Sequence, residues 1–161
     1  MPDPPTCHVP GVDVRIAGAE DAGAVAALLH DFNTEFDTPS PGAEALAARL
    51  RTLLAGERTI ALLAGEPATG VALVTLRPNV WYQGPVALLD ELYVRPELRG
   101  GGIGTALLGR ACEAVRERGA ELFEVNVDED DTGARRFYER HGFVNTPPGQ
   151  RDRMLYYERE L

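Results

Sequence analysis

The sequence predicts one α/β domain, on the basis of its length, its apolar content and the alternation of its strand and helix patterns. The chain has 161 residues, of which 44% are hydrophobic. This size allows a single core that buries most of the surface of the unfolded chain. Strand-like and helix-like spacings of apolar residues follow one another along the sequence, which places the chain in the α/β (α+β) class.

The elements of the first half follow from local composition. Residues 12–17 alternate apolar and polar side chains, as a short strand does. An acidic first turn opens an alanine-rich helix over 19–32, and a loop with two prolines separates it from a second helix over 43–55. Apolar runs bounded by turn residues predict the next three strands, over 59–64, 70–76 and 86–94.

The second half continues with helix and strand in turn. Helices are expected over 102–118 and 132–141. Each is followed by a glycine, Gly119 or Gly142, in the position of a left-handed cap. An apolar stretch over 122–127 lies between them and predicts another strand.

The two ends of the chain are expected to differ in order. Residues 1–11 contain four prolines and no signal-peptide pattern, so they are expected to form a flexible leader. No repeat or linker follows, and residues 12–161 are assigned to one domain. A final strand is expected over 154–160, where it would complete the sheet or pair across a homodimer.

The composition excludes several classes of function. A net charge of −9 gives no basic face for nucleic acid, and no apolar run is long enough to span a membrane. Two distant cysteines, Cys7 and Cys112, favour a reducing, cytoplasmic location. The histidines lack ligand spacing, so no metal is expected. All sixteen basic residues are arginine, which excludes a P-loop lysine and lysine Schiff-base chemistry.

The most informative segment runs from Asp90 to Gly104 and reads Asp-Glu-Leu-Tyr-Val-Arg-Pro-Glu-Leu-Arg-Gly-Gly-Gly-Ile-Gly. A strand, a glycine-rich turn and a helix start follow one another here. This order aims unpaired backbone N–H groups and a helix dipole at one anion. A glycine inside a helix costs about 0.5–1 kcal/mol relative to alanine, so several together indicate more than a flexible turn. The segment predicts a phosphate site.

Two common phosphate motifs do not fit these glycines. A dinucleotide fingerprint needs a third glycine or alanine where Thr105 or Leu107 stands, and a Walker loop needs a lysine. The segment does match Arg/Gln-x-x-Gly-x-Gly/Ala from Arg99 to Gly104, after Leu-Tyr-Val and a proline. In this the sequence resembles the GNAT superfamily of acetyl-coenzyme A-dependent N-acetyltransferases, and the likeness in element order extends from Val12 to the C-terminus.

The resemblance implies a fold and a cosubstrate. It implies a central, mixed and mostly antiparallel sheet flanked by about four helices, with acetyl-coenzyme A as the acetyl donor. The preceding strand would pair its backbone with the extended pantetheine arm, at Leu92, Tyr93 and Val94. The pyrophosphate would bind the loop and helix start, at Arg99, Gly100, Gly101, Gly102, Ile103, Gly104 and Thr105. For Arg99, a solvated surface position is the alternative.

A second block, from Asp131 to Phe143, resembles the family's Asn-x-x-Ala-x-x-Phe-Tyr-x-x-x-Gly-Phe segment. The resemblance implies Tyr138 as the general acid, because a phenol of pKa about 10 can protonate a departing thiolate. The alternative for Tyr138 is a core aromatic, which is the interpretation favoured for Phe137. The family usually has asparagine at Asp131. An asparagine can donate a hydrogen bond to the coenzyme, whereas an ionised aspartate only accepts hydrogen bonds. Asp131 therefore either keeps the family's contact with the coenzyme or instead caps the helix, where an acceptor is needed.

Two carboxylates stand nearest the expected thioester, and one is expected to take the proton from the amine. On a regular strand Asp90 shares a face with Leu92, and Glu91 shares the other face with Tyr93. Only one of them should therefore point into the cleft. The segment 81–94 also resembles diamine acetyltransferases, which favours Asp90 as the base and leaves Glu91 as the alternative.

The loop after the first helix usually walls the acceptor site in this family. Here it holds Phe32, Glu35 and Phe36, and carboxylates beside aromatic rings suit a cationic amine. An ordinary solvated acidic loop is the alternative. Trp81 is expected either to line the same pocket or to pack at a turn.

Together the motifs predict an acyltransferase that moves an acetyl group from acetyl-coenzyme A to a primary amine by direct attack in a ternary complex. A small cationic amine is the favoured acceptor. Two alternatives stay open. In the first, the acceptor is a protein N-terminus or lysine. In the second, the chain is a non-catalytic acyl-coenzyme A sensor, and Asp131 in place of asparagine is the feature that supports it.

Overall fold

The computed structural model describes residues 9–161. The predicted leader lies mostly outside these residues, and so do Cys7 and His8. The strands are β1 (Val14–Ala17), β2 (Thr59–Ala64), β3 (Gly70–Arg77), β4 (Val86–Val94) and β5 (Leu122–Val125). The helices are α1 (Ala22–Glu35), α2 (Ala43–Leu54), α3 (Ile103–Glu117) and α4 (Thr132–Arg140), with short 3-10 turns η1 (Ala19–Asp21) and η2 (Pro96–Leu98). The chain divides after Phe123 into two compact units.

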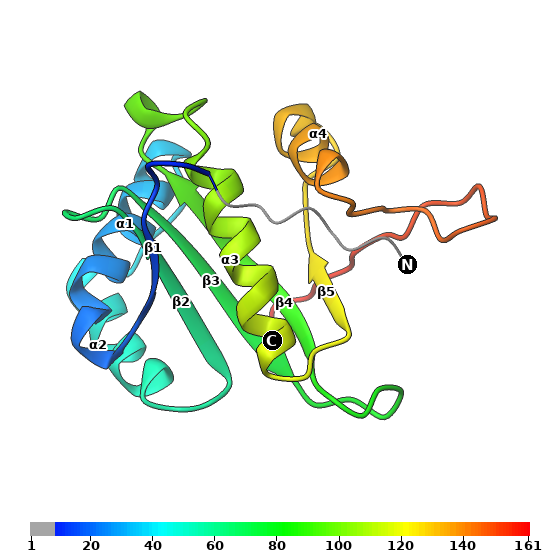
Figure 1. Cartoon of the computed structure of the whole chain (residues 1–161), viewed down its shortest axis with the longest axis horizontal. Helices are drawn as coiled ribbons and strands as arrows, with labels where there is room; N and C mark the ends of the chain where they lie inside the picture. The colour runs from blue at the N-terminus through cyan, green and yellow to red at the C-terminus, as the bar shows by residue number, and fades with distance from the viewer. Residues whose placement is uncertain (1–8) are drawn as a thin grey trace. The chain divides into compact units, whose positions relative to one another are not determined.

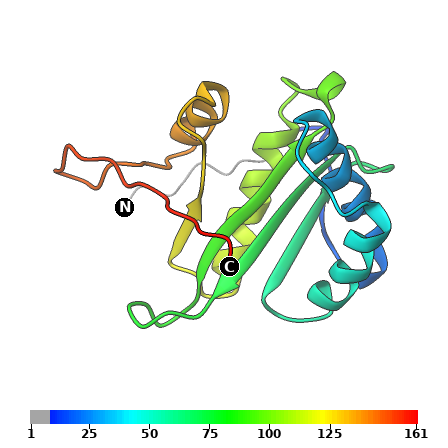
Figure 2. The ribbon, with the colours of Figure 1, turned by 180° about the vertical axis from the view of Figure 1, so that it is seen from behind.

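The strands form one sheet in the order β1-β2-β3-β4-β5. The pairings from β1 to β4 are antiparallel. Helix α3 connects β4 to its neighbour β5, which is the crossover that parallel neighbours require. Helices α1 and α2 cover one face of the sheet and α3 covers the other (Figures 1 and 2). The predicted fold class, a mixed and mostly antiparallel sheet with four α-helices, is confirmed.

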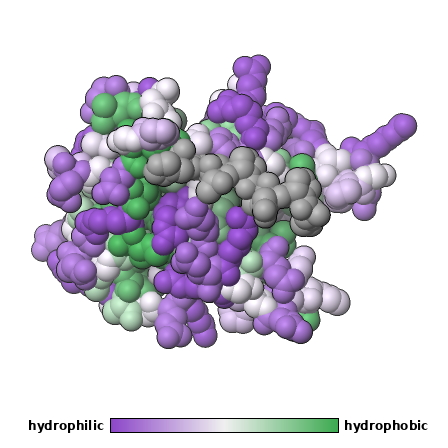
Figure 3. All heavy atoms as spheres, viewed as in Figure 1, coloured by the Kyte–Doolittle hydropathy of each residue, from purple (hydrophilic) through white to green (hydrophobic). Residues whose placement is uncertain are grey.

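The core lies on both faces of the central strands. Five of the six residues of β2 are buried, because helices cover both sides of that strand. One buried cluster joins α1 and α2 to the sheet and includes Val25, Leu28 and Leu50. On the other face α3 buries Leu107 and Leu108. Its outer side is polar, and Figure 3 shows hydrophilic side chains gathered over it.

Two glycines have conformations or neighbours that exclude a side chain. Gly102 precedes α3 with a φ of 89°, in the left-handed region. A Cβ placed there would also lie 2.8 Å from a methyl group of Val9. A Cβ on Gly84, just before β4, would lie 1.9 Å from the carbonyl oxygen of Gly119. The start of β4 therefore lies directly against the end of α3.

The C-terminal strand predicted over 154–160 is wrong. The structure has no strand or helix there, and the side chains of Met154, Leu155 and Tyr157 are 56%, 69% and 84% exposed. Aromatic and branched residues favour strands only where a neighbouring strand pairs with them. Smaller differences occur at element ends: α1 runs three residues beyond the predicted end, to Glu35, and β5 ends at Val125. Among residues 9–161, no helix has the length and apolarity needed to cross a bilayer.

Candidate active site

The N-terminus of α3 offers backbone N–H groups without a competing side chain. Gly102 is the N-cap residue, no side chain caps the helix, and its first turn has no acidic residue. The N–H groups of Ile103, Gly104 and Thr105 therefore have no acceptor inside the helix. By contrast, α2 has Glu44 in its first turn. This end of α3 has the geometry of an anion site made from backbone.

The edge of β4 that leads to this site is not covered by a strand. β4 has nine residues and β5 has four, so at least five residues of β4 extend beyond β5. Gly84 lies against Gly119, so β5, which starts at Leu122, begins near the start of β4. The uncovered stretch therefore lies at the end of β4 that includes Val94. The Val94 carbonyl there accepts a hydrogen bond of 2.9 Å from Arg99 Nε, and the other backbone groups along this edge can pair with an extended ligand.

A bulge in β4 brings Asp90 and Glu91 to one face of the sheet. Leu89 pairs with Val74 and Glu91 pairs with Leu73, so Asp90 is an extra residue without a partner. Glu91 shares the face of Leu73, because cross-strand partners point the same way. Asp90 accepts a hydrogen bond of 2.6 Å from the hydroxyl of Thr75, which shares that face. The expectation that the two carboxylates point to opposite faces is wrong.

Burial changes the acidity of both carboxylates. It raises the pKa of Asp90, and the hydrogen bond from Thr75 opposes the shift. It also raises the pKa of Glu91, and the nearby charge of Asp90 adds to that rise. A carboxylate of raised pKa is a stronger base once ionised. Thr75, which the sequence analysis did not single out, becomes evident only from the register of β3 against β4.

Three aromatic rings continue this face toward the end of β4. Tyr93, two residues after Glu91, is buried and stacks on Phe32 with ring centroids 5.2 Å apart. Phe32 meets Phe36 edge-on at 5.3 Å. The structure thus brings the predicted residues Phe32 and Phe36 to the strand that carries the carboxylates. The side chain of Tyr93 lies in the core cluster of α1 and α2.

Trp81 lies apart from this group. It is 87% exposed and belongs to the turn before β4, at the opposite end of the strand from the glycine loop (Figure 1). Eight residue steps along a strand span about 26 Å. The side chain of Asn79 fixes the turn by accepting hydrogen bonds of 2.8 Å from the N–H groups of Trp81 and Tyr82.

Arg99 and Glu35 bind each other. The guanidinium donates to the two carboxylate oxygens at 2.7 and 2.8 Å. This hydrogen bonding lowers the pKa of Glu35 and raises that of Arg99. The pKa of the Tyr93 phenol is raised by burial and by the charge of Glu35. Two residues assigned to different substrates, Arg99 to the coenzyme and Glu35 to the acceptor, therefore form one ion pair.

Tyr138 and Asp131 belong to the second unit, which comprises residues 124–161. Tyr138 is half-buried in α4, with its ring 5.2 Å from that of Phe137 and 5.6 Å from that of Phe143. Asp131 is the N-cap of α4, and its Oδ1 accepts a hydrogen bond of 2.9 Å from the N–H of Ala134. The helix-cap role considered for Asp131 is thus present. Its contact with the coenzyme stays a prediction.

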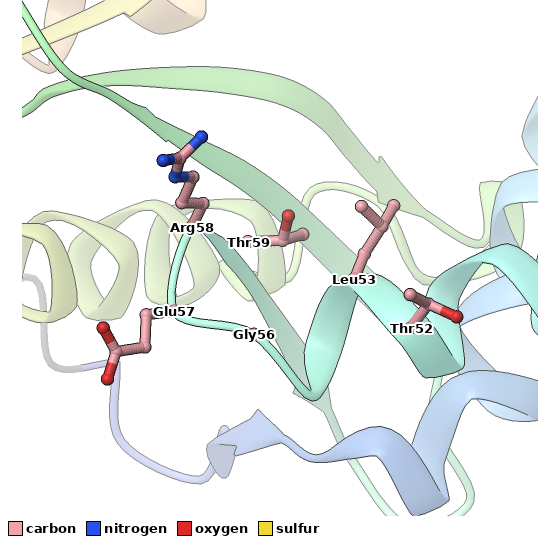
Figure 4. Close-up of a pocket in the computed structure, with 6 residues that line it drawn as sticks. All are labelled: Thr52, Leu53, Gly56, Glu57, Arg58 and Thr59. Atoms are coloured by element: carbon pink, nitrogen blue, oxygen red, sulfur yellow. The ribbon is translucent and has the colours of Figure 1, made fainter.

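A separate shallow pocket lies where α2 leads into β2 (Figure 4). Its volume is about 370 Å³, and it is lined by Thr52, Leu53, Gly56, Glu57, Arg58 and Thr59. None of the predicted site residues lines it. Among residues 9–161, no three histidine, cysteine or acidic side chains are grouped to hold a metal ion.

Comparison with known proteins gives consistent matches. The model of the acetyltransferase (GNAT) family matches residues 25–143. The aminoalkylphosphonate N-acetyltransferase of Salmonella typhimurium is 32% identical over 136 residues, which are 84% of this chain and 86% of that protein. An uncharacterized N-acetyltransferase of Methanocaldococcus jannaschii is 45% identical over 58 residues, which are 36% of this chain and 26% of that relative. A crystal structure from Arthrobacter sp. FB24, provisionally assigned as an acetyltransferase, matches with a TM-score of 0.90 at 58% identity and covers 96% of this chain and 99% of that one.

Proposed function

Because the chain belongs to the GNAT family of acetyltransferases, we propose that it transfers an acetyl group from acetyl-coenzyme A to a small cationic primary amine. The observations that carry this proposal are the carboxylate pair of Asp90 and Glu91 on one face of β4 and the open N-terminus of α3, the helix that follows β4 in the chain. The pair suits the acceptor and the anion site suits the donor.

Support for the donor comes from the uncapped start of α3 and the open edge of β4. The pyrophosphate would accept hydrogen bonds from the backbone of Gly100 through Thr105, where the helix dipole also favours negative charge. The pantetheine arm would pair with the backbone of Leu92 and Val94. The chain has a net charge of −9, so a local backbone site is needed to hold an anion.

Support for the acceptor comes from charge and ring chemistry. Asp90 and Glu91 lie on the same face of the sheet as Tyr93, on which Phe32 of α1 stacks, and carboxylates with rings favour an alkylammonium ion. The relative from Salmonella typhimurium is named for the acetylation of an aminoalkylphosphonate, which is a small amine. This favours a small molecule over a protein as the acceptor.

The proposed reaction is a direct transfer. Asp90 takes a proton from the ammonium ion, with Glu91 as the alternative base, and the freed lone pair attacks the thioester carbonyl. The new C–N bond forms as the C–S bond breaks. Tyr138 donates its phenolic proton to the departing thiolate, and the second proton lost by the amine nitrogen restores the Tyr138 phenol. The proton taken by the carboxylate is later released to water, so the net products are the amide, free coenzyme A and one proton. The backbone N–H groups of β4 would stabilise the negative charge on the carbonyl oxygen.

The donor site is tested best at Gly101. A Cβ on Gly101 meets nothing closer than a backbone oxygen at 3.6 Å, and Gly101 lacks the left-handed φ of Gly100 and Gly102. Gly101→Glu therefore adds a negative charge without backbone strain. Calorimetry should show that coenzyme A binding is lost in Gly101→Glu and retained, within about tenfold, in Gly101→Gln. Wild-type affinity in both variants would exclude the start of α3 as the donor site.

A panel of acceptors separates the three functional alternatives. Thiol release from acetyl-coenzyme A should be fastest with small amines that carry a second positive charge. Faster release with peptides bearing a free N-terminus or lysine would assign the chain to protein acetylation. Binding of acetyl-coenzyme A without release for any amine or peptide would favour the sensor.

A further inference from the structure

Two ion pairs join α1 to the segment that leads into the glycine loop. Asp31 and Glu35 stand four residues apart in α1, a spacing that puts them on one helix face. Arg95 and Arg99 flank η2 with the same spacing. Arg95 Nη1 lies 3.1 Å from Asp31 Oδ2, and Arg99 binds both oxygens of Glu35. The carboxylate face of α1 therefore runs along the whole segment before Gly100.

The guanidinium of Arg99 is engaged by three groups. Its Nε–H donates to the Val94 carbonyl at 2.9 Å, and its carbon lies 5.5 Å from the ring centroid of Tyr93. With the two bonds to Glu35, three of its five N–H donors are used. The carboxylate of Glu35 balances its charge. An anion at the start of α3 thus meets a neutral ion pair there and not a free cation.

We propose that the Glu35–Arg99 pair is a positioning clamp, which sets the glycine loop from α1, and that Arg99 is not itself a ligand of the pyrophosphate. The inference rests on the proposed function, because it concerns how the same donor site is held. Glycines have no side chains with which to fix their own conformation. The loop of Gly100 to Gly102 is therefore set by its two ends, the start of α3 and the side chain of Arg99.

The clamp also connects the donor side of the site to the acceptor side. Glu35 is the last residue of α1, and Phe36 follows it. Phe32, about one turn earlier, stacks on the ring of Tyr93, and the guanidinium of Arg99 also lies over that ring. Removing the charge of Glu35 should therefore weaken donor binding although Glu35 belongs to α1.

The test compares two thioesters with the whole 161-residue chain. Acetyl-coenzyme A contains the pyrophosphate, and S-acetylpantetheine lacks it. The variants are Glu35→Gln, Arg99→Gln, Arg99→Lys and the double variant Glu35→Gln/Arg99→Gln. Arg110→Gln is the matched control, because it removes an equal charge from α3, where Arg110 contacts Glu113 and Glu117 only at 3.4 Å. Equilibrium binding, KM and kcat are measured for each, with thermal unfolding to establish that the variants are folded.

A clamp predicts one pattern. Glu35→Gln and Arg99→Gln each weaken binding of acetyl-coenzyme A by a similar factor, about five- to tenfold, as expected for a bidentate pair that is partly exposed. Binding of S-acetylpantetheine, which lacks the group that the loop holds, changes by less than about twofold. The double variant is no worse than either single variant, because both remove the same interaction. Arg99→Lys resembles Arg99→Gln, since a lysine cannot form the bidentate pair and the Nε bond together. The KM for the amine rises with that for the thioester, and kcat stays within about twofold.

A direct phosphate ligand predicts the opposite. Glu35→Gln would then free Arg99 and tighten acetyl-coenzyme A, Arg99→Lys would retain most of the affinity, and the double variant would bind acetyl-coenzyme A more weakly than Glu35→Gln. Any of these results overturns the clamp. If the wild type binds acetyl-coenzyme A and the variants behave as a direct phosphate ligand predicts, the clamp is wrong and the proposed function still holds. If the wild type binds neither thioester, both the proposed function and the clamp are contradicted.

Discussion

At the scale of single residues, the chemistry of the proposed site depends on one extra position in β4. Asp90 has no partner in β3, and this bulge turns its carboxylate to the face that Glu91 already occupies. Burial disfavours the ionised form of each carboxylate, and the charge of Asp90 raises the pKa of Glu91 further. Such an arrangement is unfavourable for folding and favourable for taking a proton from an ammonium ion.

Asp90→Asn should therefore separate activity from stability. The folded pKa of Asp90 is raised, so its ionised form is less favourable in the folded chain than in the unfolded chain. Its contribution to stability is greatest below the unfolded pKa, about 4, and declines as the pH rises through the folded pKa. At pH 7 the variant should unfold at the same temperature or higher, while kcat falls about a hundredfold or more.

The pH dependence of kcat/KM in the wild type and the activity of Glu91→Gln serve as controls for this prediction. The acidic limb of kcat/KM in the wild type should lie above about pH 4, where an ordinary aspartate titrates. Glu91→Gln should retain that limb if Asp90 is the base. Loss of activity in Glu91→Gln with full activity in Asp90→Asn would assign the base to Glu91, and full activity in both would exclude the pair from proton transfer.

The sequence predicts which residues belong to the proposed site but not how their side chains are oriented. The glycines and both carboxylates were identified from the sequence, because their chemistry is evident in one short segment. Their orientation was not, since the bulge depends on the register of Asp90 against Thr75, fifteen residues away. The ion pair of Glu35 with Arg99 joins residues 64 positions apart, and no local spacing indicates it.

At the scale of the elements, the open start of α3 contrasts with the turn before α1, which a side chain closes. The turn before α1 is closed by Asp21, which binds both Nη atoms of Arg15 at 2.7 Å and the N–H of Gly18 at 2.9 Å. These contacts lower the pKa of Asp21 to about 2. They fix the end of β1 to the start of α1.

Asp21→Asn should destabilise the protein in a pH-dependent way. A lowered folded pKa contributes stability above the unfolded pKa, about 4, and this is lost as the pH falls through about 2. The variant should lose about 1 kcal/mol of unfolding free energy at pH 7, as expected for a partly exposed pair. Denaturant unfolding should show this difference vanishing between about pH 4 and pH 2. The neighbouring variant Glu20→Gln is the control, and an equal loss in both would show that net charge and not the Arg15 pair is responsible.

The positions of most elements were predictable because they depend on local signals. Helical spacing with a following glycine placed α3 and α4 within one or two residues of their observed ends. The strand over 154–160 was wrong because its apolar residues resemble a strand locally, whereas pairing depends on a neighbour that no local pattern specifies. The end of α1 differs from the prediction because Pro39 and Pro41, which indicated a loop, lie beyond Phe36 and do not prevent the helix from continuing to Glu35.

At the scale of the whole molecule, a net charge of −9 affects which acceptor arrives at the site. A field of this sign attracts cations and repels anions over distances comparable to the Debye length. Raising the ionic strength from about 0.01 M to about 0.15 M shortens that length from about 30 Å to about 8 Å. The KM for a linear diamine should therefore rise about threefold or more, while that for an uncharged amine analogue changes little. A diamine KM that is independent of salt would remove charge as a basis for acceptor choice.

Product analysis with the wild-type protein tests whether the chain transfers an acetyl group from acetyl-coenzyme A to a small cationic amine. Acetyl-coenzyme A and a linear diamine are incubated with the enzyme, and mass spectrometry quantifies the acetylated amine while a thiol assay quantifies free coenzyme A. The proposed transfer predicts both products in equal amounts, formed faster than with any peptide. Bound acetyl-coenzyme A with no acetylated amine from any small cationic acceptor would contradict it.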